Sequence, residues 1–400
     1  MKIARLETIR LLEFPNILWV RVHGDDGQYG LGETFMAAAA VEAYLHEIVA
    51  PRVIGEDAFA IDRIASRLYG YLGFRSTGVE TRAASALDIA LWDLWGKATN
   101  QPVVQLLGGR TRDRIRTYNT CAGYRYIRDT RLQKVENWGL GQAPAGPYED
   151  LDAFLNRADE LAHSLLEQGI TGMKIWPFDP AAEASGGTYI SGPDLDRALE
   201  PFAKIRKAVG NRMDIMVEFH SMWNLPTAIR IARALEPFDT FWHEDPIKMD
   251  ALADLAVYAQ ASRAQVCASE TLAFRQSFRE LFEARATGIA MLDLSWCGGL
   301  SEAKKIATMA EAFHLPVAPH DCTGPVVLAA STHLSCNAPN ALIQESVRAF
   351  YTGWYTELVT ALPEVKDGMI APPPGPGLGM DLLPDITRRK DAVVRVSEAE

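Results

Sequence analysis

The stretch MDIMVE, from Met213 to Glu218, decides the fold, because two further stretches repeat its pattern at a fixed interval. DTFWHE (Asp239 to Glu244) and AQVCASE (Ala264 to Glu270) are also short apolar runs that end in a glutamate, and the three glutamates stand 26 residues apart. Branched and aromatic residues suit buried strands, and a helix-like stretch follows each run. The spacing predicts three successive strand-helix units of a parallel sheet, each with one carboxylate at the same edge.

Three carboxylates that meet at one edge cannot all stay ionised without a cation. The runs supply oxygen ligands, with no cysteine or histidine needed, and such ligands favour a hard divalent ion. Mg²⁺ is the usual choice where the substrate completes the coordination shell, so we expect one Mg²⁺ per active site, bound by Glu218, Glu244 and Glu270. The alternative for any one glutamate is that it caps the next helix or pairs with a surface lysine.

The composition limits the kinds of partner that the chain can have. Its 400 residues, 48% of them apolar, are enough for one large domain and a smaller one. A formal net charge of -11 argues against nucleic acid as a partner, because phosphate binding needs a basic face. An anionic substrate would then need a metal to hold it.

Neither the cysteines nor the apolar segments predict export or a membrane. The five cysteines are widely scattered, form no CxxC pair and stand mostly in apolar runs, as is typical of buried thiols in a reducing compartment. The N-terminus lacks the apolar stretch of a signal sequence, and no later segment approaches the ~20 apolar residues of a spanning helix. We expect a cytoplasmic protein that does not bind membranes.

The strand-helix pattern extends in both directions from the three glutamates. Strand-like and helix-like segments alternate from Ile115 to about residue 348, and the first strand ends near Cys121. One step is longer than the others, and its excess falls in residues 177–196, a Gly/Pro/Ser-rich stretch typical of an active-site loop. Eight parallel strands that alternate with helices close into a modified TIM (β/α)8 barrel, an α/β fold whose chemistry lies at the carboxyl ends of the strands. The polar residues expected there are Lys174, Glu218, Glu244, Glu270, Asp293, His320 and Glu345.

Segments outside the barrel predict a second, smaller α+β domain. Strand-like runs flank a turn at residues 24–27, and a broad apolar stripe predicts a buried helix from Ala83 onward. The stretch from Gly368 to Asp381 is too rich in proline and glycine to form a barrel helix. We predict an N-terminal capping domain (residues 1–113), a barrel (residues 114–350) and a C-terminal segment (residues 351–400) that returns to the capping domain and completes it.

Several motifs together give the chain a resemblance to a known family. They are GLGET (Gly30 to Thr34), ALDIALWDLWGKATNQPVVQLLGG (Ala86 to Gly109), HEDP (His243 to Pro246), ASET (Ala268 to Thr271), LDLSWCGGLSEAKKIA (Leu292 to Ala307) and PGLG (Pro376 to Gly379). With them the chain resembles the enolase superfamily and, within it, the mandelate racemase subgroup. The resemblance implies a capping domain over a modified barrel, Mg²⁺, removal of the proton α to a carboxylate, and assembly into homodimers or octamers.

The resemblance also implies roles for the strand ends. Glu218, Glu244 and Glu270 match the family's metal ligands, although the first of these positions is usually aspartate. Asp293 and His320 match a pair in which the aspartate orients the histidine and raises its basicity, so His320 is the expected base. The alternative for His320 is an ordinary, hydrogen-bonded loop histidine.

Glu345 matches an acidic residue opposite the metal. In the family this residue is protonated or shares a proton, and it donates a hydrogen bond to the enediolate that forms when the α-proton leaves. The alternative is that Glu345 makes only a salt bridge in the last strand.

One position departs from the family's pattern. The subgroup carries two lysines separated by one residue, whereas GMKIWPFD supplies Lys174 and then Trp176. A racemase needs a base on each face of the α-carbon, and tryptophan cannot accept a proton. We expect Lys174 to contact the substrate carboxylate and Trp176 to line the substrate site, and the loss of one base favours β-elimination.

His220, in VEFHS, lies two residues beyond Glu218, and strand alternation predicts that both side chains point to the same side. Acid sugar dehydratases of the subgroup carry a histidine in this relation, where it protonates the departing 3-hydroxyl. The alternative is a hydrogen bond from His220 to Glu218. Arg75, Phe35 and Met36 fall where the family's capping loops close on the substrate, and we expect Arg75 to bind it.

The function we expect is a Mg²⁺-dependent acid sugar dehydratase that converts an aldonate or aldarate to a 2-keto-3-deoxy acid. His320 would remove the C2 proton, and His220 or protonated His320 would expel the 3-hydroxyl. The first alternative is a racemase, epimerase or cycloisomerase of the same superfamily, with Lys174 as second base. The second is a catalytically silent protein that binds a sugar acid. A barrel hydrolase of the amidohydrolase type fits less well, because its metals are held largely by histidines.

Overall fold

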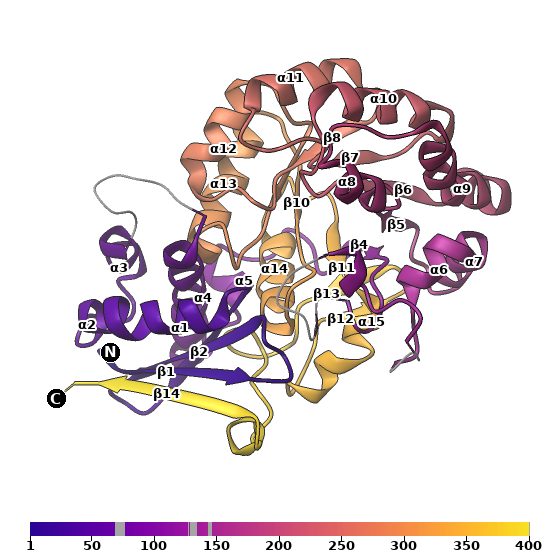
Figure 1. The fold of residues 1–400 in the computed structure, drawn as a ribbon. Helices are drawn as coiled ribbons and strands as arrows, with labels where there is room; N and C mark the ends of the chain where they lie inside the picture. Colours follow the sequence, from indigo (N-terminus) through magenta and orange to yellow (C-terminus); the bar gives the residue numbers. More distant parts are fainter. Residues whose placement is uncertain (69–76, 127, 129–133, 143–145, 400) are drawn as a thin grey trace.

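In the computed structural model of the chain, which describes residues 1–68, 77–126, 128, 134–142 and 146–399, the first and last strands lie side by side (Figure 1). They belong to a four-stranded antiparallel sheet of the order β14-β1-β2-β3. The two chain ends therefore lie close together beside the barrel (Figure 1). The strands of this sheet are β1 (Ile3–Leu11), β2 (Ile17–Gly24), β3 (Tyr29–Phe35) and β14 (Ala392–Glu398).

A long buried helix, α4 (Val79–Thr99), packs across this sheet, and two glycines of the GLGET motif permit the contact. A Cβ atom at Gly30 would lie 1.9 Å from the carbonyl oxygen of Ala90, and one at Gly32 would lie 1.9 Å from that of Ala86. Only glycine allows the two backbones to approach this closely. The other helices of this region are α1 (Ala38–Tyr44), α2 (Ala50–Val53), α3 (Ile61–Leu68) and α5 (Val103–Leu106).

Eight parallel strands form the barrel in the described part of the chain, which confirms the predicted fold class. Neighbouring strands pair in chain order, and the last strand pairs with the first. The barrel closes between β10 and the segment before β11, where Val317 bridges Ala341. The strands are β4 (Ile115–Thr120), β5 (Gly172–Ile175), β6 (Asp214–Glu218), β7 (Trp242–Glu244), β8 (Gln265–Ala268), β9 (Ile289–Leu292), β10 (Val317–Pro319) and β11 (Gln344–Ser346).

Helices surround these strands (Figure 1). One short helix, α8 (Asp179–Ser185), lies in the stretch that the sequence predicted to be a loop. The others are α6 (Asp150–Asn156), α7 (Ala158–Glu167), α9 (Gly192–Val209), α10 (Leu225–Leu235), α11 (Leu252–Ala261), α12 (Phe274–Glu283), α13 (Gly299–Ala312), α14 (Pro325–Asn337) and α15 (Arg348–Tyr351).

The segment after residue 350 contributes to both parts of the molecule. The hairpin of β12 (Glu364–Lys366) and β13 (Met369–Ala371) pairs antiparallel with the first barrel strand, β4. Among the described residues after 350, the strand that joins the N-terminal sheet is β14. The sequence predicts that this segment returns to the N-terminal region. It does not predict the contact of β13 with the barrel, because that contact consists of backbone pairing, which leaves no side-chain pattern.

The barrel interior is filled by large side chains below the polar strand ends. Tyr118 and Trp242 meet edge to face with ring centroids 5.2 Å apart. Together with residues of the other strands they form a separate buried cluster, and such layers make a barrel a packed core. This floor leaves the carboxyl ends of the strands as the place for a site. The cluster comprises Tyr118, Met216, Trp242, Cys267, Ile289, Met291, Ala318 and Ile343.

Two further findings concern the thiols and the helices. All five cysteines are buried and form no disulfide bond with one another. Among the described residues, no helix is both long enough and apolar enough to cross a membrane.

Candidate active site

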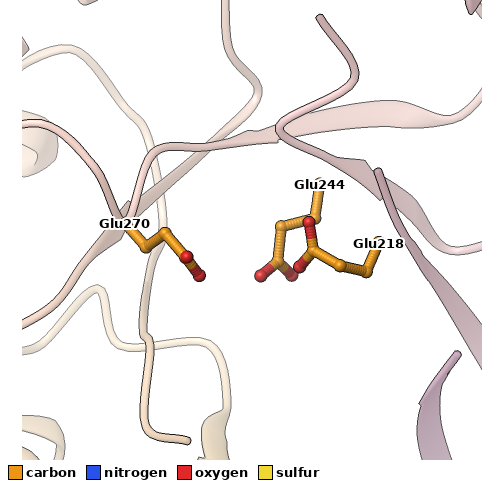
Figure 2. A group of neighbouring side chains, drawn as sticks. All are labelled: Glu218, Glu244 and Glu270. Atoms are coloured by element: carbon orange, nitrogen blue, oxygen red, sulfur yellow. The ribbon is translucent and has the colours of Figure 1, made fainter. Parts of the chain in front are cut away.

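Three glutamate carboxylates meet at the carboxyl ends of neighbouring strands (Figure 2). Glu218 ends β6, Glu244 ends β7, and Glu270 lies two residues beyond β8. One carboxylate oxygen from each lies within 4.8 Å of the other two. Burial and the neighbouring charge of Glu218 raise the pKa of Glu244 well above its ordinary value. The ionised form of Glu244 is therefore destabilised in this cluster.

A fourth carboxyl group strengthens the case that this cluster holds a cation. Asp245 directly follows Glu244 and is buried, and its Oδ2 atom accepts a hydrogen bond of 2.7 Å from Ser269. Its Oδ1 atom has no partner among the described residues. Burial, with the charges of Glu270 and Glu218, raises the pKa of Asp245 well above its ordinary value. Oxygen donors, burial and an unpartnered carboxylate atom fit a hard divalent ion.

Lys174 lies between the carboxylates on strand β5 and is almost fully buried. Its Nζ atom is 2.5 Å from Glu244, 2.9 Å from Glu345 and 3.3 Å from Glu218. Burial opposes the ammonium charge, but Glu244 and Glu345 outweigh burial and raise the pKa of Lys174 well above its ordinary value. Lys174 is therefore a charged donor at neutral pH.

His320, just beyond β10, lies between two carboxylates. Its Nδ1 atom is 2.7 Å from Asp293 Oδ2, and its Nε2 atom is 2.9 Å from Glu270 Oε2. Asp293 accepts further hydrogen bonds from the backbone and hydroxyl of Ser295, which fix its own position. Burial opposes the charged form of Glu270, but His320 outweighs burial and lowers the pKa of Glu270 to about 2. Asp293 thus fixes one edge of the ring, and the other edge faces the glutamate cluster.

Glu345, on β11, accepts hydrogen bonds at both carboxylate oxygens. Thr120 donates to Oε1 and the backbone of Asp321 donates to Oε2, with Lys174 close by. Burial raises the pKa of Glu345, but the charges of Lys174 and His320 outweigh burial and lower it. This is the pattern of an ionised carboxylate, and the proton-sharing role of Glu345 stays a prediction.

His220 reaches the same cavity as Glu218, although not through strand alternation. Strand β6 ends at Glu218, and His220 has a positive φ of 50° in the turn that follows. Its Nδ1 atom lies 2.7 Å from Oδ2 of Asp179, the first residue of α8. Burial opposes the charged ring, but Asp179 and Glu218 outweigh burial and raise the pKa of His220 to about 9. Its backbone N–H donates to Glu218 over 2.7 Å.

Trp176 lines a cavity at the strand ends. Its indole is packed among aromatic rings and meets the His220 ring edge to face at 5.9 Å. The indole Nε1 atom has no partner among the described residues. Arg75, the other residue predicted to bind substrate, lies outside the described residues. The cavity is lined by Phe35, Met36, Thr120, Tyr126, Lys174, Trp176, Glu218, His220, Glu270, Trp296, His320 and Cys322.

Sequence reasoning missed several residues of this cavity and its surroundings. Asp179 stood in a stretch read as a loop, and its only signal was the helix start Asp-Pro. Asp245 and Trp296 stood inside quoted motifs without a proposed role. Thr120 is the last residue of the first barrel strand, where the predicted strand end was Cys121, and Tyr126 lies six residues beyond it. Position at a strand end was the only available signal for Thr120, and Tyr126 had no comparable signal.

Comparisons with protein families agree with this geometry. The model described as the N-terminal domain of mandelate racemase and muconate lactonizing enzyme matches residues 13–108. The model described as enolase C-terminal domain-like matches residues 157–386. The first match covers two strands of the N-terminal sheet, β2 and β3, and the helices of that region, and the second covers most of the barrel.

Individual relatives cover nearly the whole chain. D-galactonate dehydratase of Ralstonia nicotianae is 32% identical over 389 residues, which are 96% of this chain and 92% of the relative. The same enzyme of Xanthomonas campestris is 31% identical, covering 97% of this chain and 94% of the relative. Two solved structures, an enolase of the mandelate racemase subgroup from Agrobacterium tumefaciens and an enolase protein from Sargasso Sea sequencing, are 62% and 46% identical. Both have a TM-score of 0.89 and cover 100% of this chain and 99% of the other.

Proposed function

The chain belongs to the mandelate racemase and muconate lactonizing enzyme family of the enolase superfamily and is an enzyme of the hydro-lyase class, and we propose that its substrate is an acid sugar. The substrate would be an aldonate or an aldarate, and the product a 2-keto-3-deoxy acid. D-galactonate dehydratases at about 31% identity support this substrate class. One observation carries the proposal: a single cavity is lined by His320, His220 and Lys174 beside Glu218 and Glu270, with Trp176 where a second base is expected.

Glu218, Glu244 and Glu270 are the residues that would hold a metal ion, and we propose Mg²⁺, which members of the superfamily generally use. When bound, the ion would supply positive charge beside the substrate carboxylate, where negative charge develops as the α-proton leaves. Lys174 would donate a hydrogen bond to the same carboxylate, because its buried ammonium lies at this edge of the barrel. The longer arm of Glu218, compared with the usual aspartate, reaches the cluster from the end of β6.

His320 would remove the C2 proton. Asp293 contacts Nδ1, and Nε2 faces Glu270, so Nε2 would be the atom that takes the proton once the Glu270 carboxylate is bound to the metal ion. The negative charge of Asp293 also stabilises the imidazolium that results. The same arrangement of an orienting carboxylate and a histidine base supports proton abstraction in enzymes generally.

His220 would donate the proton that the departing 3-hydroxyl needs, because hydroxide is a poor leaving group without it. Asp179 supports this role by fixing the ring through Nδ1. Trp176 supports elimination in two ways. It cannot serve as a base on the second face of the α-carbon, and its unpartnered indole N–H can donate to a substrate hydroxyl.

A panel of aldonic and aldaric acids tests the proposal. The purified enzyme is incubated with Mg²⁺ and each diastereomer, and the 2-keto acid is detected as its semicarbazone. At least one diastereomer should yield product, and His320→Asn should yield none. Epimerised acid sugar without keto acid would instead identify an isomerase. Mg²⁺-dependent binding by calorimetry, with no diastereomer consumed, would identify a silent binding protein.

The proposal extends to the assembly of the protein. We propose a homo-oligomer, a dimer or an octamer, that acts on a small-molecule carboxylate in the cytoplasm without nucleic acid or membrane partners. Light scattering of the purified chain gives the number of subunits directly, and a monomer at micromolar concentration would contradict this part.

A further inference from the structure

The ring of His320 is covered by a second aromatic side chain, that of Trp296. The ring centroids are 5.5 Å apart and the planes are inclined by 30°, which is a stacked arrangement. Trp296 is 7% exposed and lines the cavity. Asp293 therefore restrains one edge of the His320 ring, and Trp296 restrains its face.

Trp296 is held in turn by the N-terminal part of the chain. Its indole N–H donates to the carbonyl of Phe35, at the end of β3, over 3.2 Å. The guanidinium of Arg82, on α4, lies over the indole at 4.6 Å from a ring centroid and donates to the same carbonyl over 2.5 Å. A continuous stack thus runs from Arg82 through Trp296 to His320.

The backbone around Trp296 is tied to the same strand. Thr34, next to Phe35 on β3, donates its hydroxyl hydrogen bond to the carbonyl of Ser295 over 3.0 Å. The backbone N–H of Trp296 donates to the carbonyl of Asp293 over 3.1 Å. A shift of Trp296 would therefore disturb two contacts of the His320 ring: the stacking on its face and the contact of Asp293 with its edge.

We propose that Trp296 is a positioning residue for His320, and that Arg82 and Phe35 of the N-terminal region hold it there. The inference rests on the proposed role of His320 as the base. Under this proposal the N-terminal region helps to align the base, in addition to any role in closing over the substrate. The competing explanation is that Trp296 is only a wall of the cavity that contacts the substrate.

Two substitutions separate these explanations. Trp296→Phe keeps a flat ring against His320, whereas Trp296→Leu removes the stack. With a turned-over acid sugar in D₂O, Trp296→Leu should lower the turnover number for C2-proton exchange by about 10–100-fold, with KM changed less than about threefold. Trp296→Phe should stay within about threefold of the wild-type turnover number. A raised KM at unchanged turnover, or equal losses in both variants, would overturn the proposal.

A matched control accounts for the loss of buried volume, and a second variant tests the same stack if Trp296→Leu does not fold. Trp354 is a fully buried tryptophan outside the cavity lining, so Trp354→Leu removes a similar volume and should lower thermal stability without lowering the exchange turnover of folded enzyme. If Trp296→Leu does not fold, Arg82→Met tests the same stack, because it removes the guanidinium and its hydrogen bond. It should lower exchange turnover in the same direction, and unchanged turnover would overturn the proposal.

A structural measurement distinguishes failure of this inference from failure of the proposed function. Crystal structures of the wild type and of Trp296→Leu are compared at His320. The inference predicts that the imidazole plane rotates and that its Nδ1 atom leaves hydrogen-bonding distance of Asp293. An unmoved ring refutes it whatever the substrate is, whereas a wild type that consumes no acid sugar refutes only the proposed function.

Discussion

The Oδ2 atom of Asp179 lies 2.7 Å from the Nδ1 atom of His220. The two residues come from the start of α8 and from the turn after β6, so they are 41 positions apart in the chain. Asp179 is 3% exposed, and its other carboxylate oxygen has no partner among the described residues. A buried carboxylate with this geometry fixes the orientation and tautomer of a histidine, as Asp293 does for His320.

Asp179→Asn should separate the two halves of the reaction. Because Asp179 orients the proposed acid and not the base, elimination should slow by about 10–100-fold while C2-proton exchange continues. NMR in D₂O measures both rates in one sample, and His220→Asn should give a larger effect of the same kind. Asp150→Asn is the control, since Asp150 is buried and bonded to Arg348. Parallel loss of exchange and elimination in Asp179→Asn would contradict the assignment.

Mg²⁺ should stabilise the folded protein through the three glutamates. An ion that binds only the folded state adds about 2.7 kcal/mol at a concentration of 100 times its Kd. Calorimetric scans should therefore show a melting temperature that rises with Mg²⁺ in the wild type and stays constant in Glu244→Gln. Glu136→Gln removes an exposed carboxylate and should behave as the wild type does. A rise of equal size in Glu244→Gln would place the ion elsewhere.

Lys174→Met should bind Mg²⁺ more tightly and yet turn over less substrate. The ammonium contacts Glu218 and Glu244 directly, so its removal leaves more negative charge for a cation. At an effective dielectric constant of 20 this gain corresponds to about tenfold or more in Kd. Isothermal titration calorimetry measures it. Lys97→Met is the control, because Lys97, on α4, pairs with Asp93 of the same helix and with Asp381 of the C-terminal segment. Weaker Mg²⁺ binding in Lys174→Met would contradict the prediction.

His333 should make stability depend on pH. Its ring, on α14, accepts from the backbone N–H of Val104 and contacts the carbonyl of Leu378, so it joins three parts of the chain. Burial lowers the pKa of His333 from 6.5 to about 4. The unfolded chain therefore binds this proton first, and the free energy of unfolding falls as pH drops from 6.5 towards 4, by up to about 1.4 kcal/mol per pH unit.

Urea titrations between about pH 7 and about pH 4.5 measure this effect. His333→Gln should show a shallower decrease than the wild type over this range, whereas substitution of the exposed His314 by glutamine should leave the slope unchanged. Equal slopes in the wild type and in His333→Gln would show that His333 is not the titrating group.

The sequence alone predicted the barrel because its signal is periodic. Short apolar runs that end in polar residues at steps near 26 fit a barrel of strand-helix units, and each of the eight strands ends within two residues of the predicted position. Element limits were less predictable. The run from Asp239 to Glu244 forms a strand only from Trp242 onward, because local pattern does not show where pairing with neighbouring strands begins.

The surroundings of the polar residues could not be predicted in the same way. Asp179 contacts His220 from the start of α8, and Trp296, which stacks on His320, is hydrogen-bonded to Phe35 of the N-terminal sheet. Contacts between segments that are far apart in the chain produce no repeating pattern in a single sequence, so they could not be predicted from it. Strand alternation predicted the correct direction for the His220 side chain, but for the wrong reason. His220 lies beyond the strand and faces the cavity because its own backbone is left-handed.

The central claim is one-sided proton removal followed by loss of the 3-hydroxyl, and one NMR experiment tests it most directly. The enzyme, Mg²⁺ and an acid sugar from the panel are followed by ¹H NMR in D₂O. We predict disappearance of the C2 proton and appearance of a 2-keto-3-deoxy acid with deuterium at C3. For His220→Asn, C2 exchange should continue with little elimination. Exchange or epimerisation at C2 by the wild type, with no loss of the 3-hydroxyl from any acid sugar, would contradict the account.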